Sequence, residues 1–128
     1  MNVLIIEDDK VSSFALKHII EDQGHTVSVD RNAEEAMDAI IEGKFDLVFS
    51  DIMMPGISGL SLLTILRTVH LCKTPVIAMS VLNDKELIAA AYQAGANDFL
   101  LKPFNTDDLK KKLQKFADGE YKNTDKAE

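Results

Sequence analysis

The stretch LIIEDD, Leu4 to Asp9, runs an apolar segment directly into three consecutive carboxylates. Two carboxylates about 4 Å apart repel each other by roughly 4 kcal/mol at an effective dielectric constant near 20. A chain that ends a buried strand on so much like charge needs a compensating group. The pattern therefore predicts a strand that ends at a charged functional site.

Short apolar runs rich in β-branched residues recur along the chain, and a helical pattern follows each of them. We predict strands at 2–6, 26–29, 46–50, 75–79 and 98–101, and helices at 11–23, 33–42, 59–71, 84–94 and 106–117. Asn32, Asn83 and Asn105 are the expected N-caps of three helices. Strict alternation implies a parallel sheet with helices on both faces. We expect a doubly wound, flavodoxin-like α/β fold of five strands in the order 2-1-3-4-5.

The length, composition and net charge of the chain indicate what kind of protein it is. With 128 residues, of which 46% are hydrophobic and 27% charged, the chain suits a single globular domain. We place this domain at 1–118, followed by a polar tail at 119–128 that we expect to fray. The formal net charge of −7 argues against nucleic-acid binding through this chain, because a surface that tracks phosphates is basic.

Location is also indicated by the sequence. Cys72 is the single cysteine, so no intramolecular disulfide can form, which suits a reducing compartment. The apolar segments fall short of the roughly 18 residues of a membrane span, and the first residues lack the pattern of a signal peptide. We expect a cytoplasmic protein with no membrane contact.

Polar residues follow the predicted strands at the edge where ligands bind in doubly wound sheets. Glu7 and Asp8 follow the first strand and Asp51 the third. Strands one and three are neighbours in the expected order, so these carboxylates face each other. Hard anionic oxygens of this kind suit Mg²⁺, with Mn²⁺ as the alternative ion, and a bound ion would remove the repulsion.

A second group of side chains follows the fourth and fifth strands. Ser80 and Lys102 are expected on the other side of the metal, where they can bind an anion. Asp51 stands closest to both the metal and these groups. It is therefore the predicted nucleophile, a carboxylate able to form an aspartyl phosphate.

At these residues the sequence resembles the response-regulator receiver domain, over residues 2–117. The motifs IIEDD, LVFSDIMMPGISG, PVIAMS and GANDFLLKPF occur in order. The resemblance implies that Glu7 and Asp8 form the acidic pair and that Asp51 is the phosphoacceptor. Met53 would supply a backbone carbonyl to Mg²⁺, Ser80 the switch hydroxyl and Phe99 the switch aromatic ring. Lys102 would contact the phosphoryl group, the bond to Pro103 would be cis, and Asp9 would be a bystander.

The chain departs from the family pattern at two adjacent positions. Ser80 replaces the commoner threonine, which keeps the hydroxyl and loses the methyl group that restricts its rotamer. Val81 stands where the family usually has a small residue. These changes concern the rate of hydrolysis and the access of water to the phosphoryl group.

Each residue taken alone has a simpler interpretation. Glu7 and Asp8 could favour the dipole of the following helix, and Asp51 could be a turn residue. Ser80 could be an ordinary loop serine, and Phe99 taken alone is typical of a sheet core. The combination with Lys102 favours a site.

The first helix carries an aromatic residue that its core does not need. A helical wheel places Ala15, Leu16, Ile19 and Ile20 on the apolar face and leaves Phe14 outside with Ser13 and Lys17. In the resembled family this outer face docks the helical bundle of the phosphodonor histidine protein. The alternative is an isolated surface aromatic residue.

Three classes of function are compatible with this chemistry. The leading one is a signalling switch, not an enzyme with an external substrate, that takes phosphate from a sensor histidine kinase or a phosphotransfer protein. Its output partner or domain would read the face formed by the fourth helix, fifth strand and fifth helix. A phosphatase with an aspartate nucleophile would carry D-x-D after its first strand, which EDD does not match. An interaction-only pseudo-receiver usually lacks the acceptor aspartate or the lysine, and both are present.

Overall fold

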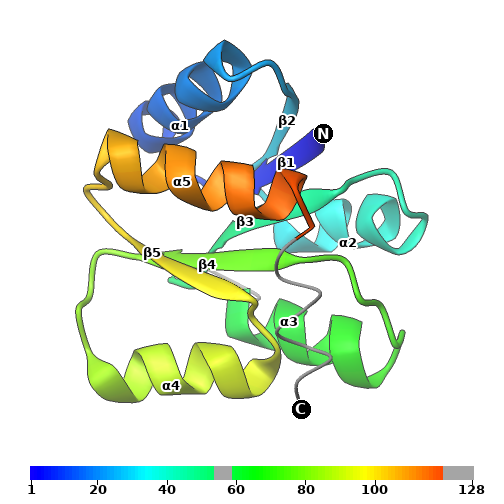
Figure 1. Ribbon diagram of the computed structural model, residues 1–128. Helices are drawn as coiled ribbons and strands as arrows, with labels where there is room; N and C mark the ends of the chain where they lie inside the picture. The colour runs from blue at the N-terminus through cyan, green and yellow to red at the C-terminus, as the bar shows by residue number, and fades with distance from the viewer. Residues whose placement is uncertain (54–58, 120–128) are drawn as a thin grey trace.

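The computed structural model describes residues 1–53 and 59–119, which form one sheet and five helices (Figure 1). The parallel strands lie in the order β2-β1-β3-β4-β5. They are β1 (Asn2–Ile6), β2 (Thr26–Asp30), β3 (Leu47–Asp51), β4 (Val76–Ser80) and β5 (Asp98–Leu101). The helices are α1 (Lys10–Asp22), α2 (Ala33–Ile41), α3 (Gly59–Thr68), α4 (Lys85–Ala94) and α5 (Thr106–Ala117). The predicted fold class and strand order are confirmed. Of the predicted tail, only Gly119 lies within the described residues.

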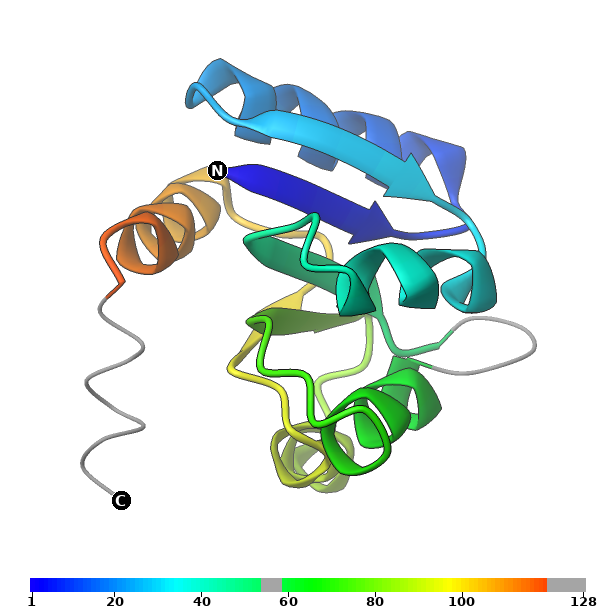
Figure 2. The same cartoon turned by 90° about the vertical axis from the view of Figure 1, so that its right-hand side faces the viewer.

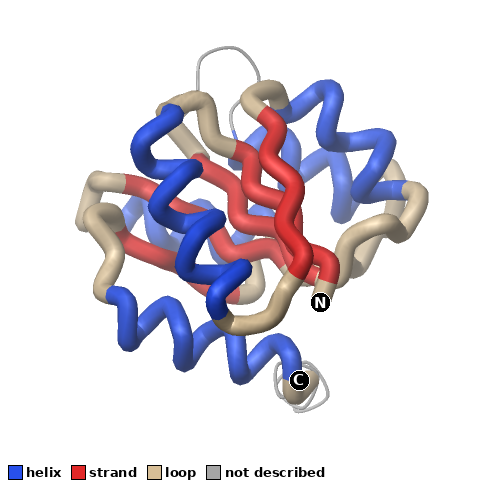
Figure 3. Tube along the Cα trace, turned by 90° about the horizontal axis from the view of Figure 1, so that it is seen from above, coloured by secondary structure: helices blue, strands red, loops and turns tan. Residues whose placement is uncertain are grey.

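Helices cover both faces of the sheet, as the view from above shows (Figure 3). One face packs against α1 and α5 around Phe49, Leu16 and Leu113, and the other packs against α2, α3 and α4 around Ile6, Ile40 and Leu63. The three central strands are buried on both faces, which accounts for their nearly continuous apolar sequences. All strands point their carboxyl ends to one edge, which Figure 2 shows for β1 and β2.

Helix starts follow capping chemistry. Asn32 and Asn105 cap α2 and α5 as predicted. The prediction of Asn83 as the cap of α4 is wrong, because Asp84 accepts the hydrogen bond from the Glu86 amide. Asp9, predicted to be a bystander, caps α1 by accepting a hydrogen bond from the Ser12 amide at 3.1 Å. Its carboxylate thus has a structural role.

The ends of several elements differ from the predicted ones by one to three residues. β3 and β4 each extend one residue further, so Asp51 and Ser80 are the last residues of their strands and not the first residues after them. α3 ends at Thr68, short of the predicted residue 71. Leu71 has a φ of 51° in the left-handed region, which is incompatible with continuing the helix.

The inner face of α1 is not quite the predicted one. Leu16 and Ile20 are buried as expected, whereas Ala15 is exposed and Ser13 and Lys17 are half-buried. The reason is an unfilled pocket of about 270 Å³ between α1 and the segment after β5, which Ala15 lines together with Pro103 and Phe104. Within the described residues, no helix is both long enough and apolar enough to cross a membrane.

Candidate functional site

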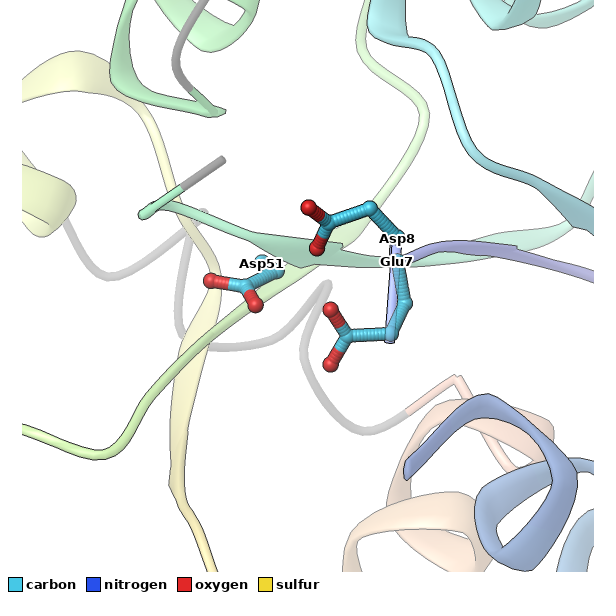
Figure 4. A group of neighbouring side chains, drawn as sticks. All are labelled: Glu7, Asp8 and Asp51. Carbon is cyan, nitrogen blue, oxygen red and sulfur yellow. The ribbon is translucent and has the colours of Figure 1, made fainter. Parts of the chain in front are cut away.

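Three carboxylates converge at the carboxyl edge of the sheet (Figure 4). Glu7 and Asp8 follow β1, Asp51 ends β3, and one oxygen from each lies within 4.8 Å of the others. β1 and β3 are hydrogen-bonded neighbours, with Ile6 opposite Ser50, so the backbone register itself brings the two acidic segments together. The predicted acidic cluster is present. Glu7 and Asp51 are buried and Asp8 is exposed.

Glu7 is only 1% exposed, although its side chain ends in a carboxyl group and it lies outside the strand. Its Oε1 accepts a hydrogen bond from the Lys102 ammonium group, and its Oε2 lies 3.4 Å from the Asp9 amide nitrogen. Both carboxylate oxygens are therefore oriented. Burial of a carboxylate is costly unless such partners compensate it.

Asp51 is held from two sides. Its Oδ1 accepts a hydrogen bond from the Met53 amide at 2.8 Å, and its Oδ2 accepts one from Lys102 Nζ at 2.8 Å. The helix α3 begins against the same backbone, since a Cβ built on Gly59 would lie 2.7 Å from the Asp51 carbonyl oxygen and 2.8 Å from the Ile52 Cα. Only glycine permits this close approach.

Lys102 bridges Glu7 and Asp51 with a single ammonium group. The residue follows β5, and the peptide bond from Lys102 to Pro103 is cis, as predicted. Sequence reasoning placed Lys102 on the far side of the site, facing an anion. The structure instead places its ammonium group among the carboxylates, where it offsets the repulsion from which the sequence argument began.

The pKa values of the bridged groups reflect this sharing. Burial, together with a hydrogen bond to Asp51, raises the pKa of Glu7 to about 7. Burial alone would raise the pKa of Asp51, but hydrogen bonds with Glu7, Lys102 and Met53 outweigh it and lower that pKa. Hydrogen bonds to the two carboxylates raise the pKa of Lys102 against the effect of its burial. Near neutral pH, Asp51 is thus the ionised carboxylate and Glu7 holds a proton part of the time.

Ser80, Met53 and Phe99 lie around this cluster. Ser80 is fully buried at the end of β4, and its Oγ accepts a hydrogen bond from the Leu82 amide at 3.0 Å. Met53 lies beside Asp51 through its amide, with its side chain exposed. Phe99 is half-buried in β5 and packs against the core on the α2, α3 and α4 side.

The donor set fits a hard divalent cation. Three carboxylates at the ends of two adjacent strands offer anionic oxygens close together, with one exposed member, Asp8, through which water can reach the site. Mg²⁺ prefers this combination of carboxylates and retained waters. Glu7, Asp8 and Asp51 are the residues that would hold it.

Comparison with known proteins decides the family. The family model described as the response regulator receiver domain matches residues 3–114. The chain belongs to this family. This is the family that the sequence motifs resemble, and the fold places the acidic cluster, Ser80 and Lys102 at one edge of the sheet.

Curated relatives share the receiver domain and extend beyond it. The chain is 35% identical over 108 residues to an uncharacterized transcriptional regulatory protein, YkoG, of Bacillus subtilis, covering 84% of this chain and 47% of that protein. It is 37% identical over 106 residues to the sensory/regulatory protein RpfC of Xanthomonas campestris, covering 80% of this chain and 15% of that protein. The chain thus spans half or less of these two relatives.

Solved structures match the whole fold. The receiver domain of the Francisella response regulator 1452 is 35% identical, with a TM-score of 0.81, and the match covers 96% of this chain and 98% of that one. The chemotaxis protein CheY4 of Vibrio cholerae is 28% identical, also with a TM-score of 0.81, covering 90% of this chain and 97% of that one.

The predicted docking residues of α1 are only partly exposed. Phe14 is 74% exposed and stacks on His18 with ring centroids 6.5 Å apart, whereas Ser13 and Lys17 are half-buried. Val11, also exposed, lines the pocket beside Phe104. The exposed apolar surface of α1 therefore centres on Phe14 and Val11, and its role as a partner face stays a prediction.

Sequence reasoning missed two residues that position the site. The capping role of Asp9 could have been found from its place three residues before Ser12, a common N-cap spacing. The close packing of Gly59 against Asp51 carries no local signal, because it depends on where α3 lies relative to β3.

Proposed function

We propose that this receiver domain accepts a phosphoryl group on Asp51 and changes conformation in response. The observation that carries the proposal is the geometry around Asp51. Lys102 Nζ lies 2.8 Å from Asp51 Oδ2. One carboxylate oxygen each of Glu7, Asp8 and Asp51 lie within 4.8 Å of one another. An ionised carboxylate beside a cation and a divalent-metal site is what phosphoryl transfer to aspartate requires.

The donor would be a phosphohistidine on a sensor histidine kinase or a histidine phosphotransfer protein. A carboxylate oxygen of Asp51 attacks phosphorus, a P–O bond forms, the P–N bond breaks, and the leaving imidazole nitrogen takes a proton. Lys102 would stabilise the negative charge on the phosphoryl oxygens, and Glu7, Asp8 and Asp51 would hold the metal. Bound Mg²⁺ would neutralise charge on the carboxylates and the phosphoryl group.

Ser80 and Phe99 would carry the change outward. Phosphorylation adds about 1.5 to 2 negative charges at Asp51. Ser80 can donate to the new oxygens if the loop after β4 moves inward and its bond from Leu82 rearranges. Phe99, which is half-buried, would then fill the vacated space. The face made by α4, β5 and α5 would differ between the two states, and an output partner or domain would read it.

The cellular setting follows from the same role. The chain would act in the cytoplasm, without contact between this chain and nucleic acid or membrane, and would catalyse only its own phosphorylation and dephosphorylation. Several relatives are named as transcriptional regulatory proteins, which supports an output domain as one kind of partner.

Intact mass spectrometry tests the proposal. With acetyl phosphate and Mg²⁺, the wild type should gain about 80 Da, the mass of one phosphoryl group. Asp51→Asn should gain nothing, and omission of Mg²⁺ should abolish the gain in the wild type. A wild type that stays unmodified under all conditions would instead indicate an interaction-only pseudo-receiver.

Calorimetry tests the metal site separately. Titration with Mg²⁺ should give a weaker affinity for Asp8→Asn than for the wild type, because one anionic ligand is lost. Equal affinities for the two proteins would remove Asp8 from the site.

A further inference from the structure

The two ends of α4 are attached to the rest of the molecule very differently. The C-terminal end lies against Arg67 of α3. Its Nε, Nη1 and Nη2 atoms all donate hydrogen bonds, at 2.8 to 3.2 Å, to the carbonyl oxygens of Cys72, Thr74 and Gly95 and to Asn97 Oδ1. Gly95 is the C-cap of α4 and accepts two of these bonds. A planar guanidinium group fixes its acceptors more firmly than a lysine ammonium group can.

This arrangement also ties the end of α4 to the sheet. Asn97 Oδ1 accepts a further hydrogen bond from the Val76 amide at 2.9 Å, and the Asn97 amide donates to the Val76 carbonyl at 2.8 Å. Arg67 and Asn97 therefore connect α3, the end of α4 and the first residue of β4. We call these two residues and Gly95 the Arg67 clamp.

The Arg67 side chain also packs directly against the backbone of Gly95. A Cβ built on Gly95 would lie 2.6 Å from Arg67 Cγ, so the arginine stem lies directly on the glycine backbone. Gly95 has a φ of +115°, a conformation that other residues rarely adopt. The end of α4 thus has one well-defined position.

The N-terminal end of α4 has no comparable attachment among the described residues. Its hydrogen bonds are local, from the Glu86 amide to Asp84 Oδ1 and from the Ile88 amide to the Asp84 carbonyl. The residues from Val81 to Glu86 are exposed, the half-buried Leu87 is the first side chain of α4 that packs against the core, and Ala91 is the one residue of α4 that is fully buried. Burial of so little apolar surface leaves this end weakly held.

We infer that α4 moves as a lever about the Arg67 clamp. The N-terminal end, next to Ser80, swings, while Gly95 and the residues after it stay in place. Arg67 is then a positioning residue that converts a displacement of the loop after β4 into a rotation of α4 instead of a translation. The part of this inference that concerns phosphorylation rests on the proposed function, and the part that concerns the unmodified protein does not.

Hydrogen exchange of the unmodified protein tests the clamp without any phosphoryl chemistry. In the wild type, the amides of Gly95 and Ala96, which bond to Tyr92 and Ala91, should exchange at least about tenfold more slowly than the amide of Ile88. In Arg67→Met this difference should shrink to about twofold or less. Lys73→Met is the matched control, because it removes a nearby exposed cation outside the clamp. Equal exchange rates at the two ends of α4 in the wild type would overturn the inference. An unchanged difference between these rates in Arg67→Met would also overturn it. If Arg67→Met does not fold, Arg67→Lys replaces it with the same two outcomes.

A beryllofluoride complex, which mimics the phosphoryl group, tests the lever itself. Binding is read independently from the ¹⁹F spectrum of the bound mimic. In the wild type, binding of the mimic should change the backbone amide chemical shifts strongly over 81–88 and hardly at all over 95–97. In Arg67→Met, the changes should also include 95–97. If the mimic is bound to the wild type and the chemical shift changes are equally large at both ends of α4, the lever is overturned. Absence of bound ¹⁹F signal contradicts the proposed function, and the exchange experiment still decides the clamp.

Discussion

Lys102 Nζ lies 2.8 Å from Asp51 Oδ2, although the two residues are 51 positions apart in the sequence. The same ammonium group also binds Glu7, so one internal cation contacts carboxylates at the ends of two neighbouring strands. A divalent cation at this site has to share those carboxylates with Lys102. The lysine is therefore both a competitor of the metal and a partner of the acceptor.

Replacement of Lys102 should separate these two roles. Lys102→Met is expected to abolish phosphorylation by acetyl phosphate while strengthening Mg²⁺ binding by about tenfold, or about 1.4 kcal/mol, because a positive charge next to the metal is removed. Intact mass and calorimetry measure the two effects. Lys111→Met, an exposed lysine of α5, serves as the control and should change neither. Weaker Mg²⁺ binding by Lys102→Met would contradict the competition.

The affinity for Mg²⁺ should depend on pH through Glu7. Burial and a hydrogen bond with Asp51 raise the pKa of Glu7 to about 7. Below about pH 7, the metal-free protein holds a proton on Glu7 that Mg²⁺ must displace, so affinity falls as the pH falls. Well above pH 7 the carboxylate is already ionised, and affinity becomes independent of pH. Calorimetry in buffers of different ionisation enthalpy counts the protons released. Glu7→Gln should release none, and proton release that persists in Glu7→Gln would assign it to another group.

Gly59→Ala should displace the phosphoacceptor. A Cβ at this position would meet the backbone of Asp51 and Ile52 at less than 3.0 Å, and neither backbone atom can move without shifting the end of β3. A displacement near 1 Å can reduce a reaction rate by about 100-fold, and we expect a loss of about 10- to 100-fold in the phosphorylation rate. Thr64→Ala, an exposed change on the same helix, is the control. A normal rate in folded Gly59→Ala would show that the contact does not position Asp51.

The phosphoryl group should be long-lived because apolar side chains surround its approach. Met53 is bonded to Asp51 through its amide, and Val81 and Leu82 directly follow Ser80 in the chain. All three side chains are exposed and apolar, and none can orient an attacking water by hydrogen bonding. Branched Val81 is also restricted at χ1. First-order loss of phosphate should therefore be faster in Val81→Ala and in Met53→Asn than in the wild type. Unchanged rates in both variants would mean that access of water is not limiting.

Ser50 offers a test of stability that is independent of phosphorylation. Among the described residues, its Oγ is buried without a hydrogen-bond partner. An unsatisfied buried hydroxyl group costs about 1 kcal/mol or more. Ser50→Ala should therefore raise the free energy of unfolding in urea by about 1 kcal/mol. A loss of stability of similar size would indicate a partner such as an ordered water molecule.

Much of this architecture could be predicted from local sequence. The apolar runs that became β1 and β5 and the caps Asn32 and Asn105 depend on neighbours in the chain, so their patterns are readable directly. The acidic cluster also follows from the expected sheet, because the strand order makes β1 and β3 neighbours and their parallel direction brings Glu7 and Asp51 to one edge.

The features that could not be predicted depend on side-chain direction and on packing between distant elements. The bridge from Lys102 to Glu7 spans 95 residues, and no spacing rule specifies that the lysine points inward. The helical wheel placed Ala15 in the core because it assumes a fully covered face, whereas the pocket beside Phe104 leaves that residue uncovered. The Arg67 clamp depends on carbonyl groups, which every residue has and no sequence motif marks.

The contact between Glu7 and Lys102 joins the first strand to the last. A growing chain on the ribosome acquires its acidic residues early, but it cannot bring an ammonium group to them until β5 has been synthesised and has paired with β4. Fragments that end before Lys102 carry the acceptor aspartate without the cation beside it. Competence to take up phosphate would therefore coincide with completion of the sheet, and premature signalling by nascent or truncated chains would be excluded by the order of the strands.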